Sequence, residues 1–458
     1  MIQLSGVSYT YPEAGCPALR EIDLTVRDGE WLLLAGPSGC GKSTLLYLLN
    51  GLAPQVLGGT LSGEVRVDGF VPGQIPIREV SRHVGTVFQN PETQLFMLRV
   101  GEDVAFGCEN LAFAPSETHR RVERALAQFS LTVIQYQEVF KLSGGQKQRL
   151  AIAGATAMGC RTLLLDEPTS DLDDDSRAEL LAALSELHRA GHTIIMTEHR
   201  LEPLIGIVDR MITMEVGRIV SNGPFPVTYS RVRNSPNRPT PSTEILVDAR
   251  ELDFAYSGGK SVLKEVSFSI GAGEIVALKG RNGSGKTTLL KLLCGLLRPT
   301  QGCLTIAGRK QPRAADLVGE VGFLFQNPDE QLFTDSVVEE IVFGPDNLGR
   351  RVELDYFLNR TGLTQYRNAH PRSLSRGERQ RLAAAAVLAM GPKVILLDEP
   401  TTGLDQPAWA ALMELVVEQA RHYGACVVFS THHAEVVETF ASRVLTISQG
   451  RLVDDCLP

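Results

Sequence analysis

Residues 36–44 read GPSGCGKST, and residues 280–288 read GRNGSGKTT. Both stretches fit the pattern G-x-x-x-x-G-K-[ST], and each follows an apolar run and opens a segment with helical periodicity. Glycines at these positions allow backbone N–H groups to converge on phosphate oxygens, and the helix N-terminus adds its positive end. The two stretches therefore predict two phosphate-binding loops, each between a buried strand and a helix of an α/β domain.

Three further motifs show that the chain repeats itself. Each recurs in the second half in the same order: FQNPETQLF at 88–96 as FQNPDEQLF at 325–333, LSGGQKQRLA at 142–151 as LSRGERQRLA at 374–383, and LLLDEPTSDLD at 163–173 as ILLDEPTTGLD at 395–405. A repeat of this size is a whole domain rather than a solenoid unit. We expect a first domain at residues 1–222 and a second at residues 244–458.

The segment between the two copies reads as a linker. Residues 223–243 contain five prolines and show no hydrophobic periodicity. Within each half, short apolar runs alternate with helical patterns, which predicts a mostly parallel sheet covered by helices. Strict alternation near each start, as at Ile22, Leu24 and Val26, predicts an additional small antiparallel sheet.

Composition excludes several classes of protein. Apolar runs such as Trp31–Ala35 and Val394–Leu397 have only four or five residues, and none approaches the length of about 18 that a membrane span needs, so we expect no bilayer crossing by this chain. Forty-five basic and 53 acidic residues give a net charge of -8. Because nucleic-acid binding normally leaves a basic footprint, this balance argues against a nucleic-acid partner.

The repeated motifs also supply candidate groups for phosphate and metal chemistry. Lys42 and Lys286 are expected to reach the β- and γ-phosphates of a nucleotide, and the hydroxyls of Ser43 and Thr287 are expected to hold Mg²⁺.

Two carboxylates follow each later apolar strand. Asp166 and Asp398 end these strands, where an acidic group that serves Mg²⁺ belongs. Glu167 and Glu399 come directly after them, and a glutamate in that place can orient or deprotonate an attacking water. We therefore expect two hydrolytic sites.

Together the motifs resemble the ATP-binding cassette (ABC) ATPases over essentially the whole chain, twice. LSGGQ at 142–146 and LSRGE at 374–378 match the family signature, which other P-loop ATPases lack, although Arg376 replaces its first glycine. The resemblance implies two tandem P-loop NTPase domains. Each would combine a mostly parallel sheet, a small antiparallel β subdomain and a helical subdomain that carries the signature.

The resemblance also implies roles for individual residues. The switch histidines, His199 and His432, would contact the γ-phosphate as part of the catalytic set with Glu167 and Glu399. The remaining residues implied to bind ATP are Gly36, Ser38, Gly39, Gly41, Lys42, Ser43, Thr44, Gly280, Asn282, Gly283, Gly285, Lys286, Thr287 and Thr288 in the P-loops, Tyr11 and Tyr256 at the adenine, and Gln89 and Gln326, which would also contact Mg²⁺.

In this family the signature of one domain closes on the nucleotide held by the other. The resemblance therefore implies pairing of the two domains within one chain. It also implies two composite sites, formed by Ser143 and Gly145 with the ATP at Lys286 and by Ser375 and Gly377 with the ATP at Lys42.

One segment is similar to the energy-coupling-factor (ECF) group of ABC importers. NP-x-x-QLF follows each glutamine (Asn90–Phe96 and Asn327–Phe333). In that group this segment contacts a transmembrane T component, and a separate membrane S component selects the solute. The resemblance implies a peripheral protein on the cytoplasmic face of the membrane that energises import of a vitamin, vitamin precursor or metal ion.

Three other functional classes fit the sequence less well. Tandem ABC proteins that act on ribosomes usually carry a long basic helical linker, unlike the proline-rich segment here. DNA-repair ABC ATPases need zinc-binding CxxC pairs, and this chain has none. The fused ATPases of sugar importers do not usually read NP-x-x-QLF. Simple core packing by Leu95, Phe96, Leu332 and Phe333 is the structural alternative for that segment.

Overall fold

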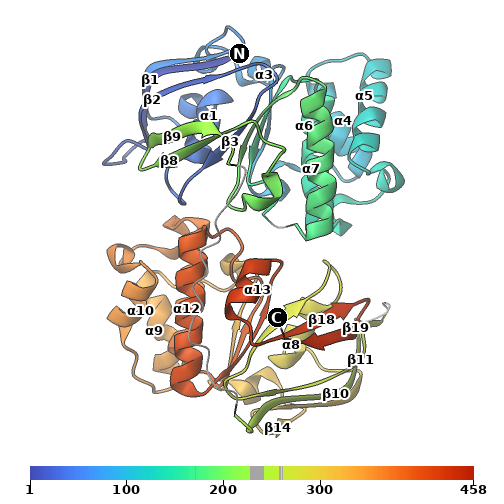
Figure 1. Cartoon of the computed structure of the whole chain (residues 1–458), viewed down its shortest axis with the longest axis vertical. Coiled ribbons are helices and arrows are strands. Elements are labelled where there is room, and N and C mark those ends of the chain that lie inside the picture. The colour runs from blue at the N-terminus through green and yellow to red at the C-terminus, as the bar shows by residue number, and fades with distance from the viewer. Residues whose placement is uncertain (171, 227–241, 257–258, 260, 458) are drawn as a thin grey trace. The chain divides into compact units, whose positions relative to one another are not determined.

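The computed structural model describes residues 1–170, 172–226, 242–256, 259 and 261–457. The chain divides into two compact units, Met1–Ser230 and Arg231–Pro458, each described by itself (Figure 1). Among the described residues, no helix combines the length and the apolar character that crossing a bilayer requires.

A six-stranded sheet forms the centre of the first unit. Its strands lie in the order β5 (Val84–Val87), β6 (Thr162–Asp166), β7 (Thr193–Thr197), β3 (Trp31–Ala35), β8 (Arg210–Glu215) and β9 (Arg218–Pro224). The first five strands are parallel, and β9 pairs with β8 in the antiparallel direction. Every residue of β3, β6 and β7 is buried, as expected for strands covered on both faces.

The two faces of this sheet pack against different layers. Trp31 and Leu33 of β3 lie in the core formed with the helices, whereas Leu32 and Leu34 lie in the core that includes the small front sheet. That front sheet is antiparallel, in the order β2 (Leu19–Val26), β1 (Ile2–Thr10) and β4 (Thr60–Val67). Alternate residues along its strands are buried, because one face is covered and the other meets solvent.

Helices complete the first unit. They are α1 (Lys42–Leu49), α2 (Leu52–Gln55), α3 (Ile77–Val80), α4 (Val100–Asn110), α5 (Pro115–Gln128), α6 (Gly144–Ala157) and α7 (Asp174–Arg189), with 3-10 turns η1 (Pro72–Gln74), η2 (Pro91–Gln94), η3 (Thr132–Ile134), η4 (Val139–Lys141) and η5 (Glu202–Leu204). In Figure 1, α4, α5, α6 and α7 lie on the side of the unit away from β1 and β2.

The second unit repeats this plan. Its central sheet has the order β15 (Val321–Leu324), β16 (Val394–Leu397), β17 (Cys426–Ser430), β12 (Ile275–Lys279), β18 (Arg443–Ser448) and β19 (Arg451–Cys456), and its front sheet has the order β11 (Ser261–Gly271), β10 (Ile245–Ala255), β13 (Gln301–Ile306) and β14 (Arg309–Lys310). Its helices are α8 (Lys286–Leu293), α9 (Val337–Asn347), α10 (Leu354–Arg360), α11 (Arg376–Ala389), α12 (Gln406–Tyr423) and α13 (Ala434–Phe440), with η6 (Ala314–Leu317), η7 (Pro328–Glu330), η8 (Thr364–Tyr366) and η9 (Pro371–Ser373).

These sheets and helices confirm the expected α/β architecture of two repeated units. The expected linker at 223–243 falls mostly outside the described residues, which omit 227–241. Its first two residues belong instead to β9, where Pro224 pairs with Arg210, and Phe225 is buried in the core. The folded part of the first unit therefore extends beyond residue 222, because the last strand continues through the first proline of the segment.

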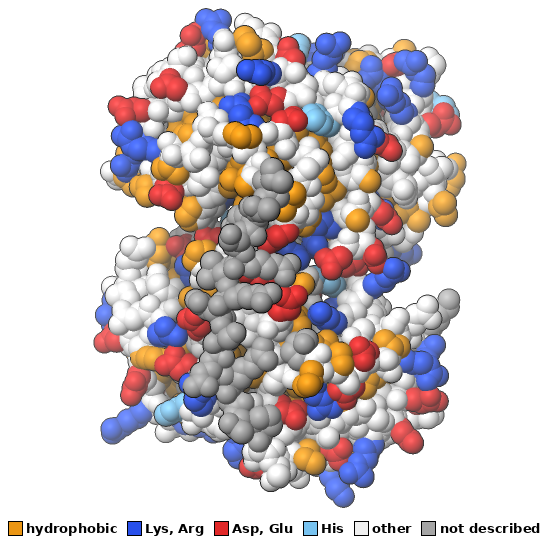
Figure 2. All heavy atoms as spheres, viewed as in Figure 1, with side chains coloured by type: hydrophobic (Ala, Val, Ile, Leu, Met, Phe, Trp, Pro, Cys, Tyr) orange, Lys and Arg blue, Asp and Glu red, His pale blue; other side chains and the backbone are white. Residues whose placement is uncertain are grey.

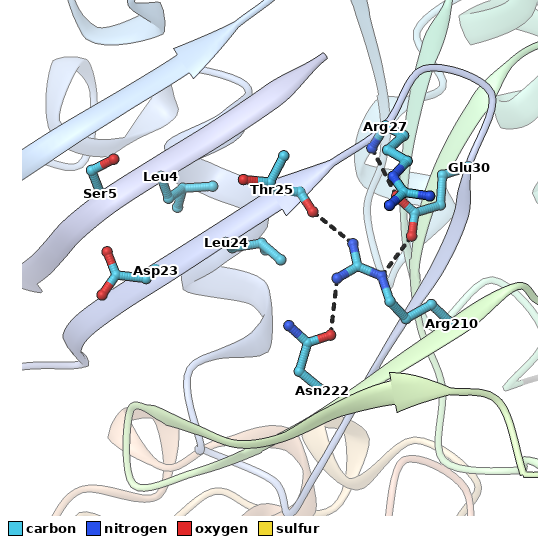
Figure 3. A pocket seen from close by; sticks show the side chains of 9 residues that line it. All are labelled: Leu4, Ser5, Asp23, Leu24, Thr25, Arg27, Glu30, Arg210 and Asn222. Carbon is cyan, nitrogen blue, oxygen red and sulfur yellow. Dashed lines mark hydrogen bonds and ion pairs between the residues drawn. The ribbon is translucent and has the colours of Figure 1, made fainter.

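A partly buried arginine joins three parts of the first unit. The guanidinium of Arg210 donates to Glu30 Oε1 at 2.5 Å, to the Thr25 carbonyl at 2.7 Å and to Asn222 Oδ1 at 2.9 Å. Figure 3 shows this side chain crossing a polar hollow from β8 toward β2. Leu4, Ser5, Asp23, Leu24, Thr25, Arg27, Glu30, Arg210 and Asn222 line that hollow. Arg210 thereby ties the front sheet to the edge of the central sheet.

We predict that Arg210→Met lowers the free energy of unfolding of the first unit by about 1–3 kcal/mol, because it removes charge-assisted hydrogen bonds and leaves the Thr25 carbonyl without this donor. Chemical denaturation of the full chain measures the change. Arg218→Met is the matched control. Arg218 pairs with Glu21, both side chains are more than half exposed, and its loss is expected to cost less than about 0.5 kcal/mol. Equal effects of the two substitutions would contradict the prediction.

Candidate nucleotide-binding and hydrolysis sites

The first P-loop connects β3 to α1 in a conformation that only glycine permits. Gly36, Gly39 and Gly41 all have positive φ angles. A Cβ atom on Gly36 would lie 2.2 Å from the Met214 carbonyl oxygen, so no side chain fits there. Lys42 opens α1, and its ammonium donates to the carbonyl oxygens of Gly36 at 2.8 Å and Pro37 at 3.0 Å. The loop therefore holds a cation next to converging backbone groups, as phosphate binding requires.

The second P-loop has the same geometry. Gly280 has a φ of +148°, and a Cβ atom there would lie 2.3 Å from the Ile447 carbonyl oxygen. Lys286 opens α8 and donates to the carbonyl oxygens of Gly280 at 2.6 Å and Arg281 at 3.2 Å. The structure thus builds two equivalent loops from different sequences.

A carboxylate lies beside each loop at the end of a buried strand. Asp166 accepts a hydrogen bond from Thr197 Oγ1 at 2.6 Å, and Asp398 accepts one from Ser430 Oγ at 2.6 Å. Burial raises the pKa of Asp166, although hydrogen bonds from Thr197 and Ser43 oppose the increase. The structure therefore brings Ser43 and Asp166 together. Their oxygen-only donor set fits a hard cation such as Mg²⁺.

The glutamate that follows is held in a strained conformation. Glu167 has a φ of +48°, in the left-handed region that non-glycine residues rarely adopt. Its N–H donates to the hydroxyl of Thr197 at 2.9 Å, which keeps this conformation. Glu399 repeats the arrangement, with a φ of +48° and its N–H donated to Ser430 Oγ at 2.9 Å. The strain turns each glutamate out of the strand direction at the point where its strand ends.

In the first unit, two predicted site residues contact the carboxylate of Glu167. Gln89 Nε2 donates to Glu167 Oε2 at 2.8 Å, and His199 Nε2 lies 2.8 Å from Glu167 Oε1. Burial alone would raise the pKa of Glu167, but the hydrogen bond from His199 and the charges of His199 and Lys42 outweigh it and lower that pKa. Burial would lower the pKa of His199, and Glu167 reverses this and raises it. The pair therefore favours a carboxylate beside an imidazolium.

The second unit arranges its histidine differently. His432 Nε2 lies 3.2 Å from Glu399 Oε1, 2.9 Å from Asn282 Oδ1 and 3.3 Å from Lys286 Nζ. The histidine thus contacts both the glutamate and the P-loop. The structure brings Glu167, Gln89 and His199 together in the first unit. In the second unit it brings Glu399, Asn282 and Lys286 together around His432.

The predicted adenine-stacking tyrosines lie beside the P-loop helices. Tyr11 Oη is 3.0 Å from Thr44 Oγ1, and Tyr256 Oη is 3.3 Å from Thr288 Oγ1. The Tyr256 ring is half exposed, which leaves one side open to a stacking partner. Their role at an adenine remains a prediction.

The signature residues begin two helices. Ser143 caps α6 through a capping box with Gln146, and Ser375 caps α11 in the same way with Glu378. The cap explains the serine locally, independently of any ligand. Contact of Ser143, Gly145, Ser375 and Gly377 with a nucleotide remains a prediction.

Sequence reasoning missed the hydroxyls of Thr197 and Ser430, each of which holds both the aspartate and the glutamate of its site. A signal was present, because TIIMT at 193–197 and CVVFS at 426–430 are otherwise apolar strands that end in a hydroxyl. It also missed Glu198, which is 3% exposed and immediately precedes His199.

Comparison with known proteins identifies a family. Residues 19–170 and 263–402 match the family described as "ABC transporter". A putative ABC transporter ATP-binding protein of Methanosarcina acetivorans is 37% identical over 99% of this chain and 85% of its own length. A protein of the same description from Treponema denticola is 34% identical over 99% of this chain and 96% of its own length.

Two solved structures complete the comparison. The RNase-L inhibitor has a TM-score of 0.68 at 22% identity and covers 98% of this chain and 90% of its own, a likeness of fold. CbiO1 of Clostridium perfringens, described as part of the ABC transporter complex CbiONQ, is 32% identical with a TM-score of 0.45 over 49% of this chain and 88% of its own.

We predict that changing Glu167 and Glu399 together to Gln lowers ATP turnover by roughly 10²–10⁴-fold, the value of a lost general base. ATP binding should persist, because the P-loop lysines and glycines are unchanged. Phosphate release measures turnover, and equilibrium binding of labelled ATP measures affinity. The matched control changes the exposed Glu186 and Glu414 to Gln, with no expected effect. Turnover that equals the control would rule out these glutamates as the base.

Proposed function

The chain belongs to the ABC transporter family of ATP-binding proteins, and from this premise we propose that it energises import of a small nutrient through separate membrane subunits of the ECF type. Its enzymatic activity is hydrolysis of ATP, with Mg²⁺ as the accompanying ion. The proposed solute is a vitamin, a vitamin precursor or a metal ion. The proposed location is the cytoplasmic face of the membrane.

The chemistry proposed for each unit follows from the geometry of its site. Lys42 and Lys286 bind the phosphates, while Ser43, Asp166 and Gln89 in the first unit, and Thr287, Asp398 and Gln326 in the second, would hold Mg²⁺. The ion, when bound with the nucleotide, neutralises phosphate charge. Glu167 and Glu399 orient the attacking water and accept its proton, and the adjacent histidines fix the orientation of each carboxylate.

The observation that carries the ECF proposal is an exposed phenylalanine fixed by a buried acid. After η2, the carboxylate of Asp103 accepts the backbone N–H groups of Phe96 at 2.8 Å and Met97 at 2.9 Å. Asp103 is buried, yet the Phe96 side chain is 67% exposed and packs at 5.6 Å only on the neighbouring Phe106 ring among the described aromatic contacts. The fold thus holds an apolar ring out into solvent.

The second unit repeats this arrangement with a different acid. Glu340 Oε2 accepts the N–H groups of Phe333 at 3.1 Å and Thr334 at 3.0 Å. The Phe333 side chain is 65% exposed, and its ring lies 4.8 Å from that of Phe343. Contiguous exposed apolar groups mark interaction surfaces, so the paired exposed rings of Phe333 and Phe343 support a protein partner.

The leucines of NP-x-x-QLF behave differently from the phenylalanines. Leu332 is 9% exposed within the core of the second unit, and Leu95 packs partly buried against the core of the first. Core packing therefore explains the leucines, because their side chains point inward from the turn. The proposed contact with the T component falls on the phenylalanines.

The apolar surface is larger in the first unit. Leu98, Tyr136 and Phe140 are all more than half exposed, and the Leu98 carbonyl accepts the Val139 N–H at 2.9 Å, so the two segments lie side by side. The corresponding positions of the second unit are polar: Asp335, Asn368 and Arg372. This difference supports a membrane partner that presents unequal surfaces to the two units.

Two alternatives remain distinguishable from the proposal. On the face drawn in Figure 2, basic and acidic side chains are interspersed over both units. Purification from native membranes separates the possibilities. A small polytopic subunit with a solute-binding membrane protein supports ECF transport, ribosomal RNA supports the ribosome reading, and a sugar-specific permease supports the sugar importer.

We predict that Phe96→Glu combined with Phe333→Glu releases the chain from native membranes, because a charge replaces the apolar contact at each ring. The measure is the fraction of the protein that sediments with membranes. ATP affinity should be unchanged, since both rings lie outside the P-loops. The matched control places the same charges at Val216 and Val453, which are also more than half exposed. Release equal to that of the control would contradict the proposed docking surface.

A further inference from the structure

A buried acid distinguishes the first hydrolysis site from the second. Glu198 precedes the switch histidine in the first unit, and Thr431 precedes it in the second. Glu198 Oε1 accepts the Thr169 N–H at 2.8 Å. Thr169 lies in the turn after Glu167, so this bond joins the loop that carries the histidine to the turn that carries the glutamate.

The same turn is held at its other end by a second buried charge. Arg177 of α7 is 4% exposed, and its Nη2 donates to the Leu172 carbonyl at 2.6 Å. The guanidinium also contacts Asp174. Thus Glu198 accepts the N–H of Thr169 and Arg177 donates to the C=O of Leu172, so each charged residue holds the turn through a backbone atom.

The second unit lacks both charged groups at these positions. Thr431 Oγ1 accepts the His433 N–H at 3.0 Å, a bond within its own loop. Trp409 stands where the first unit has Arg177, and its ring lies 5.6 Å from that of His433. Aromatic packing therefore replaces the buried charges. The two units thus differ at two equivalent positions, Glu198 against Thr431 and Arg177 against Trp409.

We propose that Glu198 is a positioning residue of the first site only, which holds the Thr169 turn against the His199 loop so that Glu167 and His199 keep their 2.8 Å contact. Glu198 need not touch the nucleotide for this role. The inference rests on hydrolysis at both sites and is independent of the membrane partner, so failure of the ECF proposal leaves it intact.

If Glu198 has this positioning role, turnover at the first site should depend on the ionisation of its carboxyl group. Burial raises its pKa to about 7. The charged groups that face Glu198 are Glu167, which follows β6, and His199 and Arg200 of its own loop. Arg177 of α7 faces Arg200. A carboxylate accepts the Thr169 N–H more strongly than a neutral acid does. As pH rises through about 7 the bond strengthens, so turnover at the first site should rise there.

The experiment uses the full chain with Glu399→Gln, so that only the first site turns over, and compares Glu198→Thr, which copies the second unit, with Glu198→Gln. The amide oxygen of Gln still accepts the N–H but carries no charge. We expect Glu198→Gln to keep kcat within about twofold at high pH and to lose the step near pH 7. We expect Glu198→Thr to lower kcat by about 3- to 10-fold, the effect of one lost hydrogen bond, with KM for ATP nearly unchanged.

Thr431→Val is the matched control, since it removes the side-chain hydrogen bond at the same position of the second unit. The step near pH 7 should persist in this variant. The proposal is overturned if Glu198→Gln retains the step or if Thr431→Val removes it. A kcat of Glu198→Thr equal to that of the parent also overturns it. If Glu198→Thr does not fold, the pH profile of Glu198→Gln decides alone.

Discussion

One hydrogen bond organises the chemistry of each unit: a hydroxyl at the end of one buried strand donates to an aspartate at the end of the next. Thr197 to Asp166 and Ser430 to Asp398 both measure 2.6 Å. The bond satisfies a carboxylate that burial would otherwise penalise heavily. The same hydroxyl accepts the N–H of the following glutamate and so supports its left-handed backbone. Without it, the aspartate would lose a buried donor and the glutamate would lose the acceptor for its backbone N–H.

Much of this arrangement could be predicted from sequence, because it rests on local rules. The P-loop glycines follow from backbone sterics, and the structure shows carbonyl oxygens within 2.3 Å of the Cβ positions that Gly36 and Gly280 lack. The buried strands follow from their continuous apolar runs. Position at the end of such a strand also singled out Asp166 and Glu167 as candidates, and their roles in hydrolysis stay predictions.

Other features depend on contacts that spacing does not encode. Leu95 and Phe96 are adjacent and both apolar, and only the folded structure shows that Leu95 packs against the core while Phe96 is exposed. The difference between Glu198 and Thr431 is visible in sequence, but its partner at Thr169 lies 29 residues away. The end of β9 at Pro224 was missed because a proline at the end of an edge strand gives the same signal as a linker.

The buried acids below the exposed rings have a mechanical consequence. Asp103 belongs to α4, and α4 packs directly on the signature helix α6, where Cys108 Sγ donates to the Ala157 carbonyl at 3.2 Å. The Phe96 backbone is thus bonded to Asp103 of α4. Helix α4 in turn contacts the C-terminal end of α6, at Ala157. Displacement of the exposed Phe96 ring would therefore also displace α4 and the C-terminal end of α6, which α4 contacts.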